Sequence, residues 1–225
     1  MNWYKYWNEN EIVNNANLYR QVGMTSYGRH PSIDEWNRLI SEIHKLIDLR
    51  ESDTVLDLCC GNGMISNSIA KSCQGIVAVD FSKKLLGNFI PVSKKIHKIN
   101  CDIRDIDFKN EQFDSIIFSA SIQHLSERES IVVIGKCNKW LKENGKLIIL
   151  DIPDLKRKWN FYSNKKYRNN YISSIIKDEL IIGTWFDDQF MISVGHYFNF
   201  SKTSVIEQDS YRINHSFRFD ALLEK

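Results

Sequence analysis

The sequence predicts an α/β fold, a doubly wound and mostly parallel sheet of seven strands with an antiparallel last strand. Two observations lead to this prediction. From Thr54 onward, short apolar runs alternate with segments whose apolar residues recur at helical spacing, which is typical of a parallel sheet covered by helices on both faces. The runs themselves are almost continuously apolar, as expected of strands that are buried on both sides.

Residues 1–50 are expected to form an N-terminal helical cap. The run from Pro31 to Glu35 has the composition of a helix start, and apolar residues then recur at helical spacing as far as Ile47. The preceding stretch, VGMTSYGRHP, contains two glycines and a proline, so it is expected to be a loop.

Residues 51–153 are expected to form a cofactor-binding core of five strands and the helices between them. The predicted strands are TVLDL (54–58), GIVAVD (75–80), HKINCD (97–102), FDSIIFS (113–119) and KLIILDI (146–152). The predicted helices cover 64–72, 82–89 and 127–141. A loop is expected between the third and fourth strands, because the residues there show no helical spacing.

Residues 154–186 break the alternation and are expected to form a lid insertion above the sheet. This segment is polar, basic and aromatic, and then helical through YISSIIKDELII. Residues 187–225 are expected to add a closing helix, 187–197, and two strands, 204–208 and 217–223. The connection between these strands is too short for a helical crossover, so they are expected to be antiparallel. The whole chain is expected to be a single domain.

Composition excludes several classes of protein. Hydrophobic residues make up 43% of the chain, no run is long enough to span a bilayer, and the N-terminus lacks the apolar stretch of a secretory signal. We therefore expect a cytoplasmic protein with no membrane insertion. The 30 basic and 28 acidic residues are spread evenly, which argues against a nucleic-acid partner. The most basic stretch, Lys156–Lys166, is either a solvated surface or a cationic wall over an anionic substrate.

The five cysteines do not indicate a metal site. None of them stands at zinc-binding spacing with another cysteine or a histidine. The adjacent pair Cys59 and Cys60 would make a strained disulfide or a poor chelate. We therefore expect reduced thiols and no bound metal.

Candidate ligand-binding residues follow the strands at their carboxyl ends, where doubly wound sheets bind ligands. Asp57 lies in the first strand and is followed by the turn Gly61–Gly63, whose glycines let a ligand approach the backbone closely. Asp80 ends the second strand and can accept both ribose hydroxyls. Asp102 ends the third strand and can accept from an adenine amine, with Ile103 flat against the ring.

The glycine pattern argues against a dinucleotide. The fingerprint G-x-G-x-x-G would need a third glycine at position 66, which is Ser66, and the GK[ST] ending of a phosphate loop is absent. Three strand-end acids and two glycines instead suit an adenosine that carries an amino acid. An NAD-dependent enzyme is therefore a disfavoured alternative.

With these motifs in register, the sequence resembles the class I S-adenosylmethionine-dependent methyltransferases. VLDLCCGNG is similar to their first motif, VAVDFS to the segment with the second-strand acid, and INCDIRD to the segment with the adenine-binding acid. FDSIIFSASIQHL and LKENGKLIILDIP are similar to the fourth and fifth strands, and FRFDALLEK fits the antiparallel closing strand. The resemblance covers about residues 50–153 and, less closely, about 187–225.

The resemblance implies that S-adenosylmethionine is the cofactor and that one edge of the sheet binds it. The implied cofactor-binding residues are Asp57, Cys59, Gly61, Gly63, Asp80, Phe81, Asp102, Ile103 and Ser119. Cys59 stands where the family has its first glycine. A small side chain fits there if the backbone keeps a negative φ.

Methyl transfer mainly requires alignment of the acceptor and exclusion of water, and a hydroxyl acceptor also benefits from a base. His124, after the fourth strand, is the first candidate base, and His30 in YGRHP is the second. The alternative for each is a histidine that only packs. Tyr27, Arg29 and Trp185 are expected to contact the acceptor.

The expected function is methyl transfer to a small molecule, by a monomer or homodimer. The favoured acceptor is an oxygen of a sugar, a sugar nucleotide or a phosphate or phosphoramidate precursor in surface-polysaccharide (capsule or lipopolysaccharide) biosynthesis, an expectation that rests on the resemblance. N-methylation of a small metabolite and a non-catalytic partner that binds S-adenosylmethionine are the alternatives. A space over the cofactor that is filled by Trp or Phe would favour the non-catalytic alternative.

Overall fold

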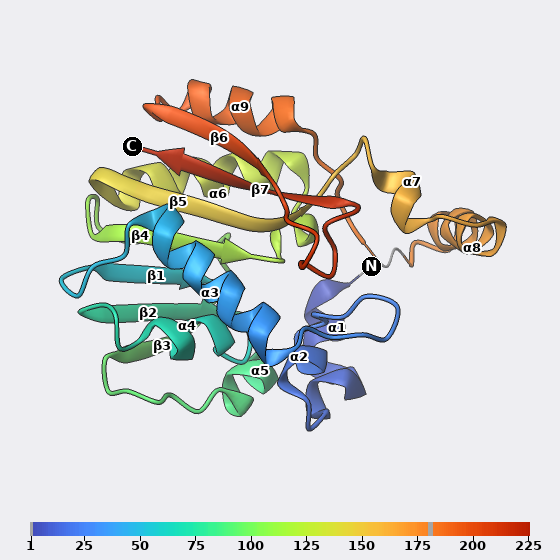
Figure 1. Ribbon diagram of the computed structural model, residues 1–225, viewed down its shortest axis with the longest axis horizontal. Helices are drawn as coiled ribbons and strands as arrows, with labels where there is room; N and C mark the ends of the chain where they lie inside the picture. Colours follow the sequence, from blue (N-terminus) through green and yellow to red (C-terminus); the bar gives the residue numbers. More distant parts are fainter. Residues whose placement is uncertain (1, 180–181) are drawn as a thin grey trace.

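The computed structural model describes residues 2–179 and 182–225, in which helices cover both faces of one sheet (Figure 1). The strand order is β3-β2-β1-β4-β5-β7-β6. The strands are β1 (Thr54–Leu58), β2 (Gly75–Asp80), β3 (Ile96–Asn100), β4 (Phe113–Ser119), β5 (Leu141–Pro153), β6 (Lys202–Glu207) and β7 (Arg218–Glu224).

Strand pairing confirms the predicted fold class. Strands β1 to β5 pair in parallel with their neighbours, whereas β7 is antiparallel to both β5 and β6. The order reverses between β1 and β4, and this reversal opens a crevice beyond the carboxyl ends of the strands.

Among the described residues, the helices are α1 (Trp3–Glu9), η1 (Glu11–Asn14), α2 (Leu18–Gln21), α3 (Ile33–Ile47), α4 (Met64–Ile69), α5 (Lys83–Asn88), η2 (Ile122–His124), α6 (Glu127–Trp140), α7 (Lys158–Phe161), α8 (Lys165–Ile176) and α9 (Asp188–Tyr197). Helix α3 begins with a capping box between Ser32 and Glu35, which satisfies backbone donors of its first turn. The helix start predicted at Pro31–Glu35 is therefore confirmed.

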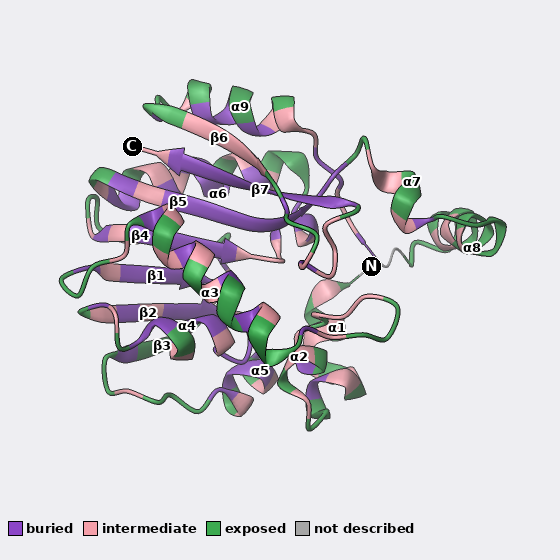
Figure 2. Cartoon of the chain, in the orientation of Figure 1, coloured by how far each residue is buried: buried purple, intermediate pink, exposed green. Residues whose placement is uncertain are grey.

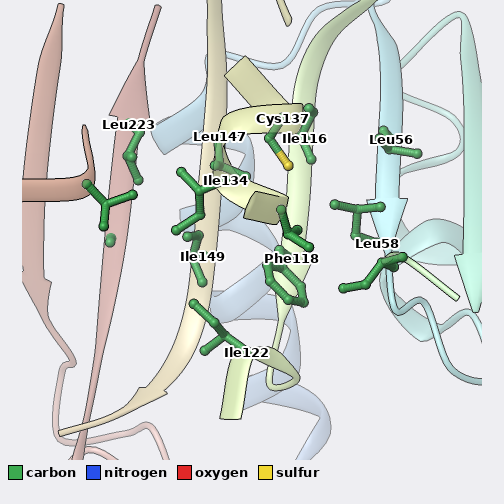
Figure 3. Close-up of a cluster of buried hydrophobic side chains, with 14 of the residues drawn as sticks. Leu56, Leu58, Ile116, Phe118, Ile122, Ile134, Cys137, Leu147, Ile149 and Leu223 are labelled. Carbon is green, nitrogen blue, oxygen red and sulfur yellow. The ribbon is translucent and has the colours of Figure 1, made fainter. Parts of the chain in front are cut away.

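Alternate side chains of the central strands enter two separate cores, because successive strand residues point to opposite faces. On one face, Leu56 and Phe118 pack with Ile134 and Cys137 of α6, as Figure 3 shows. On the other face, strand residues pack against α3 and α4. Burial on both faces accounts for the nearly continuous apolar runs of the sequence (Figure 2).

Four strands differ from their predicted limits; β6 and β7 are shifted by only one or two residues, whereas β3 and β5 differ at the ends that matter for the site and the sheet. Strand β3 ends at Asn100, so Cys101 and Asp102 follow it. Strand β5 begins at Leu141, which pairs with Phe113 ahead of a bulge. The start of β5 is therefore determined by its pairing with β4, and the local sequence has no apolar run at that point from which it could be predicted.

The insertion projects from the body at the edge where the parallel strands end, and α1 lies near the same edge (Figure 1). Helices α7 and α8 are joined to the body by an aromatic cluster that includes Tyr162, Trp185 and Phe217. Leu180 and Ile181 of the predicted insertion lie outside the described residues. No helix in the described part of the chain is long and apolar enough to cross a membrane.

Candidate cofactor and acceptor site

A cavity of about 310 Å³ lies beyond the carboxyl ends of β1, β2, β3 and β4. Of the nine residues expected to bind the cofactor, all except Gly63 line it. The topology explains this convergence, because parallel strands bring their carboxyl ends to one edge of the sheet.

The loop after β1 makes one wall of the cavity through backbone with positive φ. Gly61 and Gly63 have φ of 55° and 75°. A Cβ atom at Gly63 would lie 2.1 Å from the ring of Phe89, and one at Gly61 would lie 2.8 Å from Val22. Gly63 therefore serves the packing behind the loop and does not face the cavity.

Cys59 also has a positive φ, 57°. The expectation that a cysteine fits here with negative φ is therefore wrong. The left-handed conformation costs a residue with a side chain roughly 1–2 kcal/mol, and the surrounding turn holds it in place. Burial raises the pKa of the Cys59 thiol well above its ordinary value, although a side-chain hydrogen bond with Ser121 opposes the rise.

Asp80 ties the end of β2 to this loop. One of its carboxylate oxygens accepts from the backbone N–H of Gly61 and the other from that of Ser82, both at 2.8 Å. Burial raises the pKa of Asp80 to about 6, although these two hydrogen bonds oppose the rise. Each oxygen retains a lone pair for a ligand hydroxyl.

Asp57 is held by the residue that departs from the dinucleotide pattern. The hydroxyl of Ser66, on the first turn of α4, donates to the Asp57 carboxylate at 2.6 Å. Burial raises the pKa of Asp57 to about 7, and the neighbouring charge of Asp80 adds to the rise. Ser66 thus fixes the position of the Asp57 carboxylate.

Asp102 is paired with a residue that the sequence did not single out. Both of its carboxylate oxygens accept from the guanidinium of Arg104, at 2.9 and 2.7 Å, and Arg104 also reaches Glu129 at 2.9 Å. Burial favours a higher pKa for Asp102, but the Arg104 hydrogen bonds outweigh it and hold the pKa below its ordinary value. Asp102 therefore stays ionised.

Helix α1 covers the cavity with aromatic side chains, and the sequence prediction missed its part in the site. Trp3, Tyr4 and Trp7 all line the cavity. The ring of Tyr4 stacks on Phe81 with centroids 5.9 Å apart, and the hydroxyl of Ser82 donates to the carbonyl of Trp7 at 2.7 Å. The available signal was the spacing of Trp3 and Trp7, which puts both on one helical face.

His124 lies at the cavity wall beneath α1. Its ring centroid is 4.1 Å from that of Trp3, and Nε2 accepts a hydrogen bond from Nε1 of Trp7 at 3.3 Å. Burial, with a smaller contribution from the Arg218 cation, lowers the pKa of His124 to about 3. The imidazole is therefore neutral, and its buried Nδ1 has no hydrogen-bond partner.

The structure does not bring the other four predicted residues to the cavity. His30 stacks on Tyr19 at 5.3 Å and makes hydrogen bonds within the N-terminal segment. Arg29 pairs with Glu35. The exposed Tyr27 and the buried Trp185 both contact the insertion or its aromatic cluster. Local packing and ion pairing therefore occupy these side chains elsewhere.

Within residues 2–179 and 182–225, no group of three or more His, Cys, Asp or Glu side chains could hold a metal ion. All five cysteines are described, and each is an unpaired thiol. The cavity thus offers carboxylates, backbone groups and aromatic faces. These groups suit an adenosine with an amino-acid tail, and Asp80 and Asp102 are acceptors for hydroxyl and amine donors.

Comparison with known proteins agrees with this chemistry. Residues 55–145 match the family described as a methyltransferase domain. The demethylmenaquinone methyltransferase of Lactobacillus johnsonii is 24% identical over 155 residues, which cover 59% of this chain and 63% of that protein. The ubiquinone biosynthesis O-methyltransferase of Hydrogenovibrio crunogenus is 22% identical over 196 residues, 80% of this chain and 73% of that protein. The chain spans only 38% to 63% of the length of several curated relatives that it matches.

Solved structures show the same fold. An S-adenosylmethionine-dependent methyltransferase from Methanosarcina mazei superposes with a TM-score of 0.63 at 18% identity, over 82% of this chain and 96% of that one. Residues 55–145 thus carry the match to a methyltransferase domain, and the fold is that of the S-adenosylmethionine-dependent methyltransferases, whose cofactor is S-adenosylmethionine.

Proposed function

We propose that this protein binds S-adenosylmethionine in the cavity at the carboxyl edge of the sheet and transfers its methyl group to a small-molecule acceptor. One observation carries the proposal. Asp57, Asp80 and Asp102, from or just after three neighbouring strands, line a single cavity together with His124. The acids suit the cofactor, and the histidine lies on the side of β4 that remains for an acceptor.

The side chains of this protein hold the cofactor and exclude water, while the cofactor supplies the reactive methyl group. Asp80 accepts from the ribose hydroxyls, and Asp102 with Ile103 holds the adenine. The backbone after Cys59 and the end of β4 at Ser119 bind the methionine end. The aromatic side chains of α1 keep water from the reacting groups.

His124 remains the proposed base for a hydroxyl acceptor. With Trp7 bonded to Nε2 and the pKa at about 3, it is a weak base in this arrangement. Displacement of α1 would free Nε2 and rehydrate the ring, and the pKa would then rise towards the range where a base works at neutral pH. Movement of α1 is thus part of the proposed reaction.

The proposed acceptor is an aromatic ring of the quinol class, methylated on a hydroxyl, and the O-methylation rests on the relative that is named an O-methyltransferase. Two relatives are named for methylation of demethylmenaquinone and in ubiquinone biosynthesis, and Trp3, Tyr4 and Trp7 give the cavity flat apolar walls. The sugar or phosphate acceptor predicted from the sequence has less support, because Arg29 is paired outside the cavity. O- over N-methylation, the monomer or homodimer state and the cytoplasmic location remain predictions.

A two-part experiment tests the proposal. Calorimetry with S-adenosylhomocysteine and with NAD should show binding of the first only. Transfer of labelled methyl from S-adenosylmethionine is then measured with quinols, nucleotide sugars and phosphorylated metabolites. We expect label in the quinol products. Heat with NAD alone would overturn the cofactor assignment, and label only in a sugar or phosphate would overturn the proposed acceptor.

A non-catalytic partner that binds S-adenosylmethionine is the second candidate. The observation in its favour is that Trp3 and Trp7 already pack on His124, where an acceptor would approach. Tight binding of S-adenosylhomocysteine with no transfer to any acceptor class would support it. Replacement of both tryptophans by alanine distinguishes the two, because an enzyme with a displaceable α1 keeps measurable transfer in this variant.

A further inference from the structure

Large exposed apolar side chains gather on the insertion. On α8, Ile172, Ile175 and Ile176 are 52%, 48% and 81% exposed, and on α7 Trp159 is 50% exposed. Helix α8 has no buried residue, as its colouring in Figure 2 shows. Single exposed apolar residues are ordinary, whereas a group of them on one short segment indicates an interaction surface.

These side chains form one stripe, because residues three and four apart share a helix face. Ile172 and Ile176 are four apart, and Arg168 precedes Ile172 by the same interval. The Arg168 guanidinium lies 5.9 Å from the ring centroid of Trp159, which places the tryptophan beside the stripe. We call these five residues the α8 stripe: Trp159, Arg168, Ile172, Ile175 and Ile176.

The side of α8 that adjoins the stripe, with Tyr167 and Tyr171, faces the body of the protein. The ring centroid of Tyr171 lies 4.4 Å from that of Tyr162, which is buried in the aromatic cluster. Tyr167 also packs against this cluster. The helix is therefore held along one side, and the isoleucines of the α8 stripe lie exposed next to that side.

The charge around the stripe is mainly positive. Lys165, Lys166 and Lys177 are exposed, and none of them forms an ion pair within 4 Å among the described residues. Asp178 and Glu179 follow and offset part of this charge at one end only. Lysine and arginine stems can lie along an apolar surface while their charged ends reach anionic groups.

We propose that the α8 stripe and its lysines dock this protein on the surface of an anionic lipid bilayer. The isoleucines and the tryptophan lie beside Lys165 and Arg168, and Lys166 and Lys177 add exposed positive charge elsewhere on the same segment. Such apolar side chains can enter the headgroup boundary while the cations meet anionic headgroups. A second copy is the less favourable occupant, because a two-fold interface would bring Arg168 and the lysines against the same cations.

Because of where the insertion lies, docking would also bring the cavity close to the bilayer. This consequence rests on the proposed function. The insertion projects from the sheet edge at which the cavity lies (Figure 1), and the Tyr27 hydroxyl donates to the carbonyl of Phe161 at 3.1 Å, joining it to the N-terminal segment. Docking would turn the cavity region towards the bilayer. An acceptor dissolved in the membrane would then reach it directly.

Vesicle cosedimentation of the full chain tests the docking without any methyl acceptor. Vesicles of phosphatidylglycerol and phosphatidylcholine are compared with vesicles of phosphatidylcholine alone. We expect binding at least about tenfold stronger to the anionic vesicles, weakened by salt because screening reduces attraction between charges. Equal binding to both vesicles, or no binding to the anionic ones, overturns the proposal.

Substitution of exposed residues tests whether the α8 stripe is the surface that binds the vesicles. The double variant Ile172→Ser and Ile176→Ser should lose at least about tenfold in vesicle affinity, and Lys165→Glu with Lys166→Glu should lose a similar factor. The control is Ile90→Ser with Val92→Ser, which replaces equally exposed apolar side chains elsewhere and should bind as the parent does. Wild-type binding by both α8 variants overturns the proposal.

Two further measurements separate the outcomes. Binding of S-adenosylhomocysteine by each variant confirms that the cofactor site is intact, so loss of docking is distinct from failure of the proposed function. Sedimentation velocity without lipid examines the competing occupant. A dimer that dissociates in the Ile172→Ser, Ile176→Ser variant, together with no vesicle binding, would assign the stripe to a second copy of this chain.

Discussion

Cys59 occupies a backbone position that glycine suits better. Its φ of 57° lies in the left-handed region, where a side chain costs roughly 1–2 kcal/mol, while glycine loses roughly 0.5–1 kcal/mol through its freer unfolded chain. Cys59→Gly is therefore expected to raise the free energy of unfolding by about 0.5–1 kcal/mol, measured by urea denaturation. Cys60→Gly, where φ is not positive, should lower it. A less stable Cys59→Gly protein would show that contacts such as that with Ser121 outweigh the strain.

The raised pKa of Asp80 leads us to expect that cofactor affinity depends on pH. Its pKa is raised to about 6, and only the ionised carboxylate accepts freely from both ribose hydroxyls. Affinity for S-adenosylhomocysteine should therefore fall by about tenfold between about pH 7.5 and pH 5, as one pKa unit corresponds to a factor of ten. Calorimetry across this range measures it. Asp80→Asn should bind more weakly with less pH dependence, and an unchanged slope in this variant would assign the effect to Asp57.

Helix α1 contributes to the low pKa of His124. Its tryptophans contribute to the burial that lowers the pKa of His124 to about 3, so Trp3→Ala with Trp7→Ala should raise this pKa towards its ordinary value near 6.5. Titration of the imidazole C–H resonances by NMR measures the change. Tyr4→Ala is the matched control, because Tyr4 stacks on Phe81 instead. A pKa that stays near 3 would show that η2 and Arg218 suffice.

Local patterns predicted the strands well and the helix at the N-terminal cap correctly. The runs at 54–58, 75–80 and 113–119 coincide with β1, β2 and β4, because each run is apolar enough to be buried on both faces and is bounded by polar or turn residues. Strand β5 is longer than its run. Leu141 joins it through a pairing with Phe113, and such pairing depends on a strand that is distant in the sequence.

Burial of the carboxylates around the cavity makes the stability of the whole protein depend on pH. Burial raises the pKa of Asp57 to about 7 from its ordinary 3.8, so the folded state binds the proton more tightly than the unfolded state. The associated stability is present below about pH 4 and is lost as pH rises towards 7. His124, with a lowered pKa, acts in the opposite direction as pH falls below about 6.5.

Asp57→Asn isolates the carboxylate contribution. Asparagine can still accept from Ser66 but cannot ionise, so its stability relative to the parent protein should improve as pH rises from about 4 to 7, by an amount of the order of a few kcal/mol. Urea denaturation of both proteins without cofactor at several pH values measures the difference. A difference that stays constant with pH would mean that Asp57 titrates alike in the folded and unfolded states.

The succession of strands along the chain and the acids that end them could be predicted from the sequence alone, because period and burial are local properties of a chain. These acids are Asp57, Asp80 and Asp102, and they led to the predicted fold class and to S-adenosylmethionine as the expected cofactor. The tertiary structure was needed for everything that joins distant segments. The hydrogen bond from Trp7 to His124 links residues 117 apart, Arg104 pairs with Glu129, and His30 and Arg29 are drawn into local contacts away from the cavity. Such contacts depend on how whole elements pack against one another, so local sequence patterns cannot predict which side chains meet.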